Sequence, residues 1–592
     1  MKPVREYRWV FPEDRLASDD RSAAASTSPS PDTLGLIKKL TDELKISPTL
    51  AQLLVNRNID SYEKARAFFR PDMNDLHDPF LMDGMDLAVE RIARAIANKE
   101  TFLVYGDYDV DGTNGTALLW SFLRSVGANV SYLIPDRIKD GYGLSQRGIE
   151  IAKERGATVL ITVDCGITAI EQVNAARAAN IDVIICDHHE PGATLPRAYA
   201  VLDPIKPGCR YPFKALCGCG VAFKLVQALL SSDRLQSSLG QNADELLRSY
   251  LDLVTLATTA DIVPLTDENR VLVKLGLEII NSNPRPGIRA LIDTSGTKPG
   301  RISAGQIVFI LAPRINAVGR LGDAMRAVEL LTCESYDEAL SLARVFEEEN
   351  RARKKLDEEA FLEAQQIVEE FLDVDADIAI VLHQESWHPG VIGIVASRLV
   401  ERYYRPTIML TTVDGVVKGS ARSISGFDIH QALKRCEDKL LQFGGHKYAA
   451  GLSVDPDRVE EFKEAFNAVA RELLTDELLT PRIHIEAEMD LDELTPKFVG
   501  VLNRFAPHGP GNMRPVFAAR NVELNGPPRI VGNNHLRFKF RKNGRVFDAI
   551  GFNLGGLMER FQGRNTVDIA FSIDEGEYAG EPVPQLKIRD VR

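Results

Sequence analysis

The sequence contains no long apolar run and only 7 cysteines among 592 residues. A membrane-spanning helix needs roughly 18 consecutive apolar residues, and no stretch of the chain approaches that length, so we expect no membrane insertion. Residues 1–15 also lack the apolar core of a signal peptide. Cys217 and Cys219 lie too close together for a CxxC redox or zinc motif. We therefore expect free thiols and a protein of the reducing cytoplasm.

The chain also lacks an excess of positive charge, because its formal net charge is −13. This value argues against a surface that is coated with nucleic acid. It remains compatible with a basic channel on an acidic body, because affinity for nucleic acid depends on the local charge. A chain of 592 residues is too long for one hydrophobic core, and we expect about three or four domains.

Three aspartates occupy alternate positions in the segment LVYGDYDVDG, residues 103–112. If the preceding strand continues through them, the carboxylates of Asp107, Asp109 and Asp111 point to one face. Crowded carboxylates are costly to ionise unless a cation neutralises them, and their oxygens favour Mg²⁺ or Mn²⁺. A solvated acidic turn would show the same pattern, so the segment alone leaves both interpretations open.

Short apolar strands alternate with helices from Thr101 to about Pro264. The expected strands cover residues 101–105, 130–134, 158–163, 182–186 and 198–202. The expected helices include residues 117–126, 146–155 and 170–179. This alternation predicts a doubly wound, mainly parallel sheet, in which ligands bind beyond the carboxyl ends of the strands.

Further acidic and imidazole groups follow the predicted strands and helices of this region. Asp164 ends one strand, Asp187-His188-His189 ends another, and Asp261 follows a helix. A single aspartate of this kind is commonly a helix cap, and a single histidine is commonly a hydrogen-bonded structural residue. Together with the aspartate run, however, they supply about the number of ligands that two divalent ions need.

The remaining chain divides by composition and periodicity. We predict a flexible segment at 1–35, a helical region at 36–100, the first α/β domain at 101–345, a long charged connector helix at 346–376, a second α/β domain at 377–475 and an antiparallel OB-type barrel at 480–592. A mostly helical stretch at 271–344 is interrupted by PRINAVGRLGDA, residues 313–324.

The second α/β domain carries three predicted loops that are rich in glycine or histidine. They cover residues 387–393, 419–423 and 444–451, between or after strands expected at 377–382, 407–411 and 416–420. Glycine lets backbone amides approach a phosphate. Ordinary turns would explain any one of these loops, but explain all three less easily.

The predicted barrel has a basic segment. Strands are expected at 483–489, 516–522, 536–542, 545–552 and 567–577. Residues 507–545 contain eight basic residues and one acidic residue, Glu523. Phe538 and Phe540 alternate with these basic positions. They either stack on the bases of a single strand, as in OB-type proteins, or face the barrel core and leave Arg537, Lys539 and Arg541 outside.

These motifs together resemble the DHH phosphoesterase superfamily and, within it, the RecJ single-stranded-DNA exonucleases. The resemblance runs from about Ile46 to the C-terminus and is carried by YGDYDVDG, ITVDCGI, DHH at 187–189, TTADIVPL, YPFKALCGCGVAFKL, APRINAVGRLGDA, WHPGVIGIVASRL, KGSARS, GGHKYAAG and HGPGNMRPVF. It implies a DHH domain, a DHHA1 domain and an OB domain. It also implies a 5′→3′ exonuclease that releases 5′-mononucleotides in DNA repair and recombination. A DHH phosphodiesterase of short oligonucleotides or cyclic dinucleotides is the alternative.

The resemblance and the chemistry agree on the metal ligands for two Mn²⁺ or Mg²⁺ ions. The candidates are Asp107, Asp109, Asp111, Asp164, His188 and Asp261. Asp164 is the expected bridge between the ions. Asp187 would orient a histidine, and His189 would contact the scissile phosphate or protonate the leaving oxygen.

A terminal-phosphate pocket is also implied by the family. Its candidates are Arg137, Arg314, Ser420 and Arg422, and the arginine fork suits phosphate oxygens. A surface salt bridge is the alternative for each arginine. His446, Arg537 and Lys539 complete the predicted substrate contacts. Single-stranded DNA is the expected partner, a helicase and a single-strand-binding protein are candidate partners, and we expect a monomer.

The sequence departs from the family pattern at three places. Tyr105 stands where many relatives have the potential ligand histidine, Thr113-Asn114 replaces an apolar residue followed by threonine, and Asp203 replaces a common asparagine. None of these changes removes a carboxylate of the predicted centre.

Overall fold

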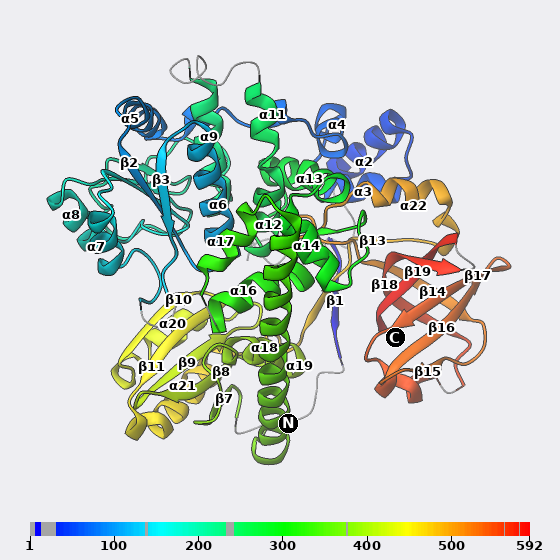
Figure 1. The fold of residues 1–592 in the computed structure, drawn as a ribbon. Coiled ribbons are helices and arrows are strands. Elements are labelled where there is room, and N and C mark those ends of the chain that lie inside the picture. The colour runs from blue at the N-terminus through cyan, green and yellow to red at the C-terminus, as the bar shows by residue number, and fades with distance from the viewer. Residues whose placement is uncertain are drawn as a thin grey trace. The chain divides into compact units, whose positions relative to one another are not determined.

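The computed structural model describes residues 6–12, 31–136, 140–232, 242–321, 323–373, 377–561, 563–578 and 581–592 (Figure 1). Its contacts divide the chain into two compact units. The first contains Met1–Asp60, Arg351–Val501 and Pro515–Arg592, and the second contains Ser61–Asn350 and Leu502–Arg514.

The second unit is built on a five-stranded parallel sheet, as the sequence predicts. Its strands, in spatial order, are β3 (Asn129–Leu133), β2 (Thr101–Gly106), β4 (Val159–Val163), β5 (Asp182–Cys186) and β6 (Ala200–Leu202). Gly106 pairs with Val163, and Val163 pairs with Cys186. The last residues of three strands are therefore level at one edge of the sheet.

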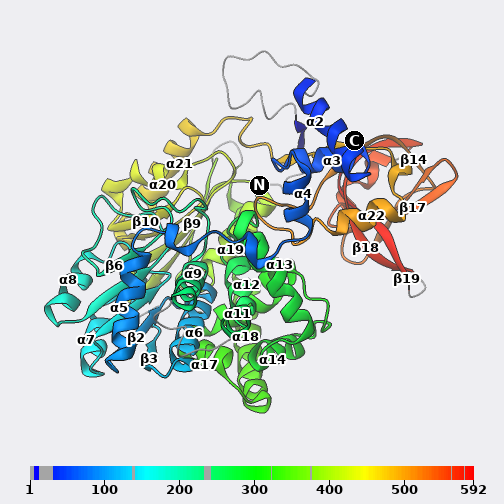
Figure 2. The same cartoon turned by 90° about the horizontal axis from the view of Figure 1, so that it is seen from above.

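Helices cover both faces of this sheet (Figures 1 and 2). Phe102 and Val104 belong to a core shared with α5 (Met85–Ala97), α6 (Val110–Ser125), α9 (Gly218–Ser231) and α12 (Leu251–Ala260). Leu103 and Tyr105 belong to a second core shared with α7 (Gln146–Glu154) and α8 (Ile170–Ala178). Side chains that point to either face of the sheet are apolar, because helices bury both faces.

The predicted strand at 101–105 is confirmed as β2, but it does not continue through the aspartate run. Strand β2 ends at Gly106, and α6 begins at Val110. The side chain of Asp109 caps this helix by accepting hydrogen bonds from the backbone amides of Asp111 and Gly112, at 2.8 and 3.1 Å. A capping aspartate favours helix initiation over strand continuation.

The rest of the second unit is helical. Its helices are α4 (Tyr62–Phe69), η1 (Met73–Asp75), η2 (Pro79–Leu81), α11 (Ala243–Arg248), α13 (Asp267–Ser282), α14 (Pro286–Ser295), α15 (Ala304–Gln306), η4 (Ile307–Leu311), α16 (Ala312–Leu321) and α17 (Met325–Thr332). The predicted interruption at 313–324 is instead mainly helix α16. Its apolar residues Ile315 and Val318 are buried at helical spacing.

The connector helix is longer than predicted. Helix α18 (Tyr336–Phe371) begins ten residues before 346 and contributes residues to both units. The predicted flexible N-terminus also contains ordered elements, because β1 (Arg8–Val10) pairs in parallel with β12 (Arg482–His484) and α2 (Pro31–Leu44) includes residues 31–33. Residues 1–5 and 13–30 of that prediction lie outside the described residues.

The first unit contains a mixed sheet of order β10-β11-β9-β8-β7. Its strands are β7 (Ile380–His383), β8 (Thr407–Val413), β9 (Val416–Arg422), β10 (Gln442–His446) and β11 (Ala449–Val454), and its helices are α19 (Ile392–Tyr403), α20 (Ile429–Lys434), η5 (Glu437–Lys439), η6 (Pro456–Arg458) and α21 (Val459–Leu473). Two of the three predicted loops are therefore wrong, because residues 419–422 lie in β9 and residues 444–446 and 449–451 lie in β10 and β11. Glycine at these positions did not prevent pairing with neighbouring strands.

The C-terminal barrel also lies in the first unit. Its strand order is β13 (Ala487–Glu488), β14 (Phe517–Leu524), β18 (Thr566–Tyr578), β19 (Glu581–Val591), β17 (Arg545–Gly551), β16 (His535–Lys542) and β15 (Arg529–Val531). An additional pairing between β14 and β16, each the second strand from one end of this order, closes the sheet. Most pairings are antiparallel, as predicted, but β13–β14 and β17–β19 are parallel. The remaining helices of this unit are α3 (Pro48–Val55), η7 (Leu491–Glu493), α22 (Pro496–Asn503) and η8 (Gly555–Phe561).

Within the described residues, no helix has both the length and the apolar character that crossing a bilayer requires.

Candidate metal centre

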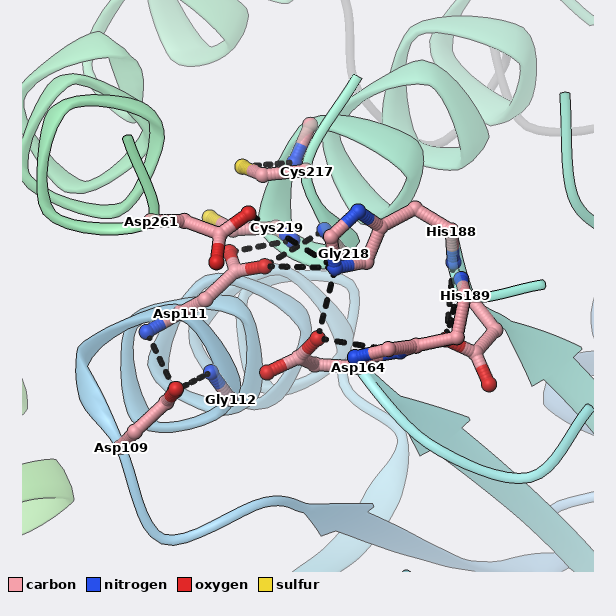
Figure 3. Close-up of polar contacts among 12 residues, drawn as sticks. Asp109, Asp111, Gly112, Asp164, His188, His189, Cys217, Gly218, Cys219 and Asp261 are labelled. Carbon is pink, nitrogen blue, oxygen red and sulfur yellow. Dashed lines mark hydrogen bonds and ion pairs between the residues drawn. The ribbon is translucent and has the colours of Figure 1, made fainter. Parts of the chain in front are cut away.

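The carboxyl edge of the parallel sheet gathers the predicted metal ligands (Figure 3). Asp107, Asp164 and Asp187 directly follow β2, β4 and β5, whose ends are level. All three side chains are buried. Parallel pairing therefore brings together carboxylates that lie up to 80 residues apart in the sequence.

Asp111 is held by the start of helix α9. Its Oδ2 accepts a hydrogen bond from the Gly218 amide at 2.6 Å, and its Oδ1 accepts one from the Cys219 amide at 2.8 Å. Free amides at a helix N-terminus stabilise a carboxylate. The same geometry requires Gly218, because a Cβ there would lie 2.6 Å from Cβ of Asp164.

His188 lies at the centre of the cluster. Its Nε2 atom is 3.1 Å from Oδ1 of Asp164, 3.7 Å from Oδ2 of Asp261 and 3.8 Å from Oδ2 of Asp111. Asp261 reaches this position because it ends helix α12. One imidazole thus faces carboxylates from three separate elements.

Three overlapping groups have ligand atoms within 4.8 Å of one another and could hold a metal ion. They are Asp107 with Asp109 and Asp164, Asp111 with His188 and Asp261, and Asp164 with His188 and His189. The structure therefore brings together all six predicted metal ligands and adds His189. Their roles as ligands stay a prediction.

The electrostatics of the cluster fit a divalent cation. Burial raises the pKa of Asp109, Asp164 and Asp261, and the charges of neighbouring carboxylates raise each pKa further. Oδ2 of Asp261 is buried and accepts no hydrogen bond among the described residues. Oxygen ligands with one or two imidazoles suit Mn²⁺ or Mg²⁺, whose charge would offset this repulsion.

Asp187 and His189 form a pair beside the cluster. Oδ1 of Asp187 lies 2.8 Å from Nδ1 of His189, and Oδ2 accepts the Ile167 amide at 2.9 Å. Burial alone would raise the pKa of Asp187 and lower that of His189. The hydrogen bond and charge of the partner outweigh burial in both, so the pKa of Asp187 is lowered and that of His189 is raised. Asp187 is therefore placed to orient His189, and this role stays a prediction.

Sequence reasoning did not identify two parts of this centre. One is the pair of backbone amides of Gly218 and Cys219. The sequence signal that could have indicated it is a glycine between two cysteines, followed by an apolar helical segment. The other is Tyr142, whose hydroxyl lies 3.1 Å from the ring nitrogens of His189. Tyr142 lies in a loop outside any strand, and no spacing rule connects it with the DHH motif.

Tyr105 is not part of the cluster. Its ring is buried in the core that the sheet shares with α7 and α8. Its hydroxyl donates a hydrogen bond to the Gly143 carbonyl at 3.0 Å. Gly148 packs directly on this ring, because a Cβ there would lie 2.6 Å from Cε2 of Tyr105. The tyrosine thus fills a structural site.

The predicted phosphate-binding residues lie in different environments. Arg314 in α16 is 5% exposed, and its Nε donates a hydrogen bond to Glu347 at 2.7 Å. In the other unit, a guanidinium nitrogen of Arg422 donates to the Ser420 hydroxyl at 3.0 Å on β9. A Cβ at Gly393 would lie 2.8 Å from this hydroxyl and 2.9 Å from the Arg422 guanidinium. Arg137 lies outside the described residues.

The basic barrel strand β16 has its phenylalanines inside. Phe538 and Phe540 are buried with stacked rings 5.5 Å apart, whereas Arg537, Lys539 and Arg541 are exposed. Of the two alternatives for these phenylalanines, the structure shows the one in which they face the barrel core and leave Arg537, Lys539 and Arg541 outside. His446 ends β10 and is exposed. The phosphate contacts of Arg537, Lys539 and His446 stay predictions.

Three domain families match the sequence. The DHH family N-terminal domain matches residues 101–258, the DHHA1 domain matches residues 375–472, and the RecJ OB domain matches residues 485–590. These matches follow the order of the parallel sheet, the mixed sheet and the barrel.

Curated relatives are similar over most of the chain. Single-stranded-DNA-specific exonuclease RecJ of Bacillus subtilis (strain 168) is 40% identical over 94% of this chain and 69% of its own length. The protein of the same name from Dickeya dadantii (strain 3937) is 36% identical over 93% of this chain and 98% of its own length. The crystal structure of RecJ in complex with Mn²⁺ from Thermus thermophilus superposes with a TM-score of 0.81 at 29% identity, and covers 99% of this chain and 79% of that one.

Proposed function

The chain belongs to the RecJ family of single-stranded-DNA-specific exonucleases, and from this membership we propose that it is a metal-dependent exonuclease of single-stranded DNA. We propose further that it works in the 5′→3′ direction, releases 5′-mononucleotides and acts in DNA repair and recombination. The observation that carries the proposal is the clustering of the six predicted ligands, five aspartates and His188, in overlapping groups whose ligand atoms lie within 4.8 Å of one another.

Each side chain of the centre has a distinct proposed role. Two Mn²⁺ or Mg²⁺ ions, when bound, would hold the scissile phosphate and activate a water molecule. The predicted ligands are Asp107, Asp109, Asp111, Asp164, His188 and Asp261. The amides of Gly218 and Cys219 fix Asp111. Asp187 fixes the His189 ring, which can then contact the phosphate or pass a proton to the leaving oxygen.

The experiment that tests this proposal is a digestion with Mn²⁺ of two otherwise identical single strands. One carries a label at its 5′ end and the other at its 3′ end, and a blunt duplex of the same sequence serves as the control. We expect immediate release of a labelled mononucleotide from the 5′ end, with the duplex left intact.

Other outcomes contradict parts of the proposal. Early release of label from the 3′ end would reverse the polarity. Rapid cleavage of fragments of two to five nucleotides, with long strands intact, would instead indicate a phosphodiesterase of short oligonucleotides. The variant Asp261→Asn should be inactive on every substrate, which excludes a contaminating nuclease as the source of the signal.

The cellular setting is a further proposal. All seven cysteines lie in the described residues and are free thiols, as is typical of proteins in a reducing cytoplasm. We therefore place the enzyme in the cytoplasm. The monomeric state and the partnership with a helicase or a single-strand-binding protein stay predictions.

A further inference from the structure

Ile262 directly follows Asp261 and has an unusual backbone conformation. Its φ is +59°, in the left-handed region. In the part of the chain that the structure describes, it is the one β-branched residue among the non-glycine residues with positive φ. A β-branched side chain is strongly disfavoured in this region, and residues held there are common at functional sites.

The turn itself does not require isoleucine. Asp261 ends helix α12, and the left-handed residue that follows a helix end is most often glycine or asparagine. Either residue would make the same turn with less strain. The identity of the side chain, rather than the path of the backbone, therefore needs an explanation.

The surrounding loop is fixed strongly enough to maintain this strain. The Leu265 amide donates a hydrogen bond to the Pro510 carbonyl at 2.7 Å, and the Asn269 side-chain amide donates one to the Pro264 carbonyl at 2.9 Å. Gly509 packs against Leu265, because a Cβ there would lie 2.7 Å from Cδ1 of Leu265. The loop is thus held by a segment distant in sequence but within the same unit.

The Ile262 side chain is not used in the core. It is 60% exposed, whereas the neighbouring Ala260 and Val263 pack against the main core of the unit. Asp261, on its N-terminal side, lies 3.7 Å from His188 at the centre of the metal cluster. An exposed aliphatic group is therefore held one residue from a predicted metal ligand.

We propose that Ile262 is a substrate-contacting residue that packs against the sugar and base of the nucleotide whose phosphate occupies the metal centre. The carboxylates and imidazoles of the centre can engage the phosphate through cations, whereas Ile262 and the exposed ring of Tyr142 beside His189 can pack against the nucleoside. An aliphatic side chain fixed beside Asp261 supplies an apolar surface without reading base identity, as a nuclease of mixed sequence requires. This inference rests on the proposed function.

The test uses Ile262→Gly and Ile262→Asn in the full-length protein. Both residues accept the left-handed conformation, so both keep the turn and remove the aliphatic group. We expect KM for a single-stranded oligonucleotide to rise by roughly fivefold or more, since part of an aliphatic side chain no longer becomes buried on binding. Turnover at saturation should stay within about twofold of the parent. Calorimetry with Mn²⁺ alone should give the parental affinity, because no ligand is changed.

Lys99→Gly is the matched control. Lys99 has a φ of +55° after helix α5 and is exposed, but it precedes β2 at the sheet edge opposite the metal centre. Its replacement relieves the same strain and should leave KM unchanged.

The outcomes separate this inference from the proposed function. A parent protein that fails to degrade single strands overturns the proposed function. A parent that degrades them, together with two Ile262 variants of parental KM, overturns only the role of Ile262. If Mn²⁺ affinity weakens while KM rises, Ile262 supports Asp261 rather than contacting the substrate, and the inference is wrong.

Discussion

The two α/β sheets use their polar residues in opposite ways. In the parallel sheet the predicted functional groups come after the strands, as Asp107, Asp164 and Asp187 do. In the mixed sheet they lie within strands, as Ser420 and Arg422 do on β9. Parallel strands all end at one edge, so groups that follow them must converge. Antiparallel strands instead expose a row of side chains along one face.

The polar groups of the two sheets also differ in how well their charges are compensated. The carboxylates of the parallel sheet are buried together and raise the pKa of one another. Ser420 and Arg422 are only partly buried and are hydrogen-bonded to each other. The first set is thus unfavourable without a cation, whereas the second is stable by itself. Strong electrostatic conflict therefore distinguishes the candidate catalytic site from the candidate recognition site.

The largest effect is expected in the parallel sheet, for Asp164→Asn. Loss of the predicted bridging ligand should reduce Mn²⁺-dependent hydrolysis at least about a thousandfold, while binding of single strands persists. In metal-free buffer at pH 8 the variant should melt no lower than the parent. The pKa of Asp164 is raised in the folded protein, so the stability that its protonated form contributes is lost as pH rises through that pKa. Asparagine carries no charge, so the variant does not suffer this loss.

The control for this variant is Asp86→Asn, which removes an exposed carboxylate in the first turn of α5. Hydrolysis rates and melting curves with and without Mn²⁺ provide the measurement. Activity of Asp164→Asn within about tenfold of the parent would remove Asp164 from the metal centre.

Arg314→Ala should affect stability more than recognition. The substitution removes the buried Arg314 guanidinium and its ion pair with Glu347, so the free energy of unfolding should fall by about 3 kcal/mol. Urea denaturation measures the loss, and Arg344→Ala on the exposed side of α18 is the control. Unchanged stability, together with weaker binding of strands that carry a 5′-phosphate, would instead make Arg314 a direct phosphate ligand.

Arg422→Ala should affect recognition more than stability. If β9 binds the terminal phosphate, KM should rise about tenfold on 5′-phosphorylated strands and much less on 5′-hydroxyl strands. Arg435→Ala is the control, because Arg435 is exposed and paired with Glu472 at 2.8 Å. An equal rise in KM on both substrates would separate Arg422 from the terminal phosphate.

The smallest effect is expected on the barrel, for Lys539→Ala. A single exposed phosphate contact should weaken binding of long strands by about twofold to threefold and reduce the salt dependence by about one ion. Arg541→Ala should do less, because Arg541 already forms an ion pair with Glu523 on β14. Fluorescence titrations at several salt concentrations measure both variants, and an identical salt dependence in the parent and Lys539→Ala would exclude the contact.

The sequence predicted the parallel sheet well because its strands are short, apolar and separated by helices of clear period. It also placed Asp164, Asp187-His188-His189 and Asp261 at the ends of predicted elements, and the structure brings these side chains together. It left the conformation of the aspartate run open, and the structure shows that the Asp109 side chain caps the start of helix α6 there. Sequence periodicity predicts which face of an element is buried. A helix cap instead depends on one side chain and the two backbone amides that it accepts hydrogen bonds from.

The tertiary structure decided which neighbours each polar group has. Arg314 and Glu347 are 33 residues apart, and no local pattern connects them. The same holds for Asp111 and the amides of Gly218 and Cys219, which meet only because α6 and α9 pack on one sheet face. Phe538 and Phe540 lie in the core because the barrel closes around that face of β16. The strand pattern alone does not decide which face is inside.

By itself, therefore, the sequence determined the order of the elements, the kinds of ligand and the family to which they belong. Those properties depend on residue type and short-range spacing. Only the folded chain determined that the carboxylates crowd around His188 and that Ile262 is held beside them in a strained turn. Burial and mutual distance create these properties, and both arise from packing between segments far apart in the sequence.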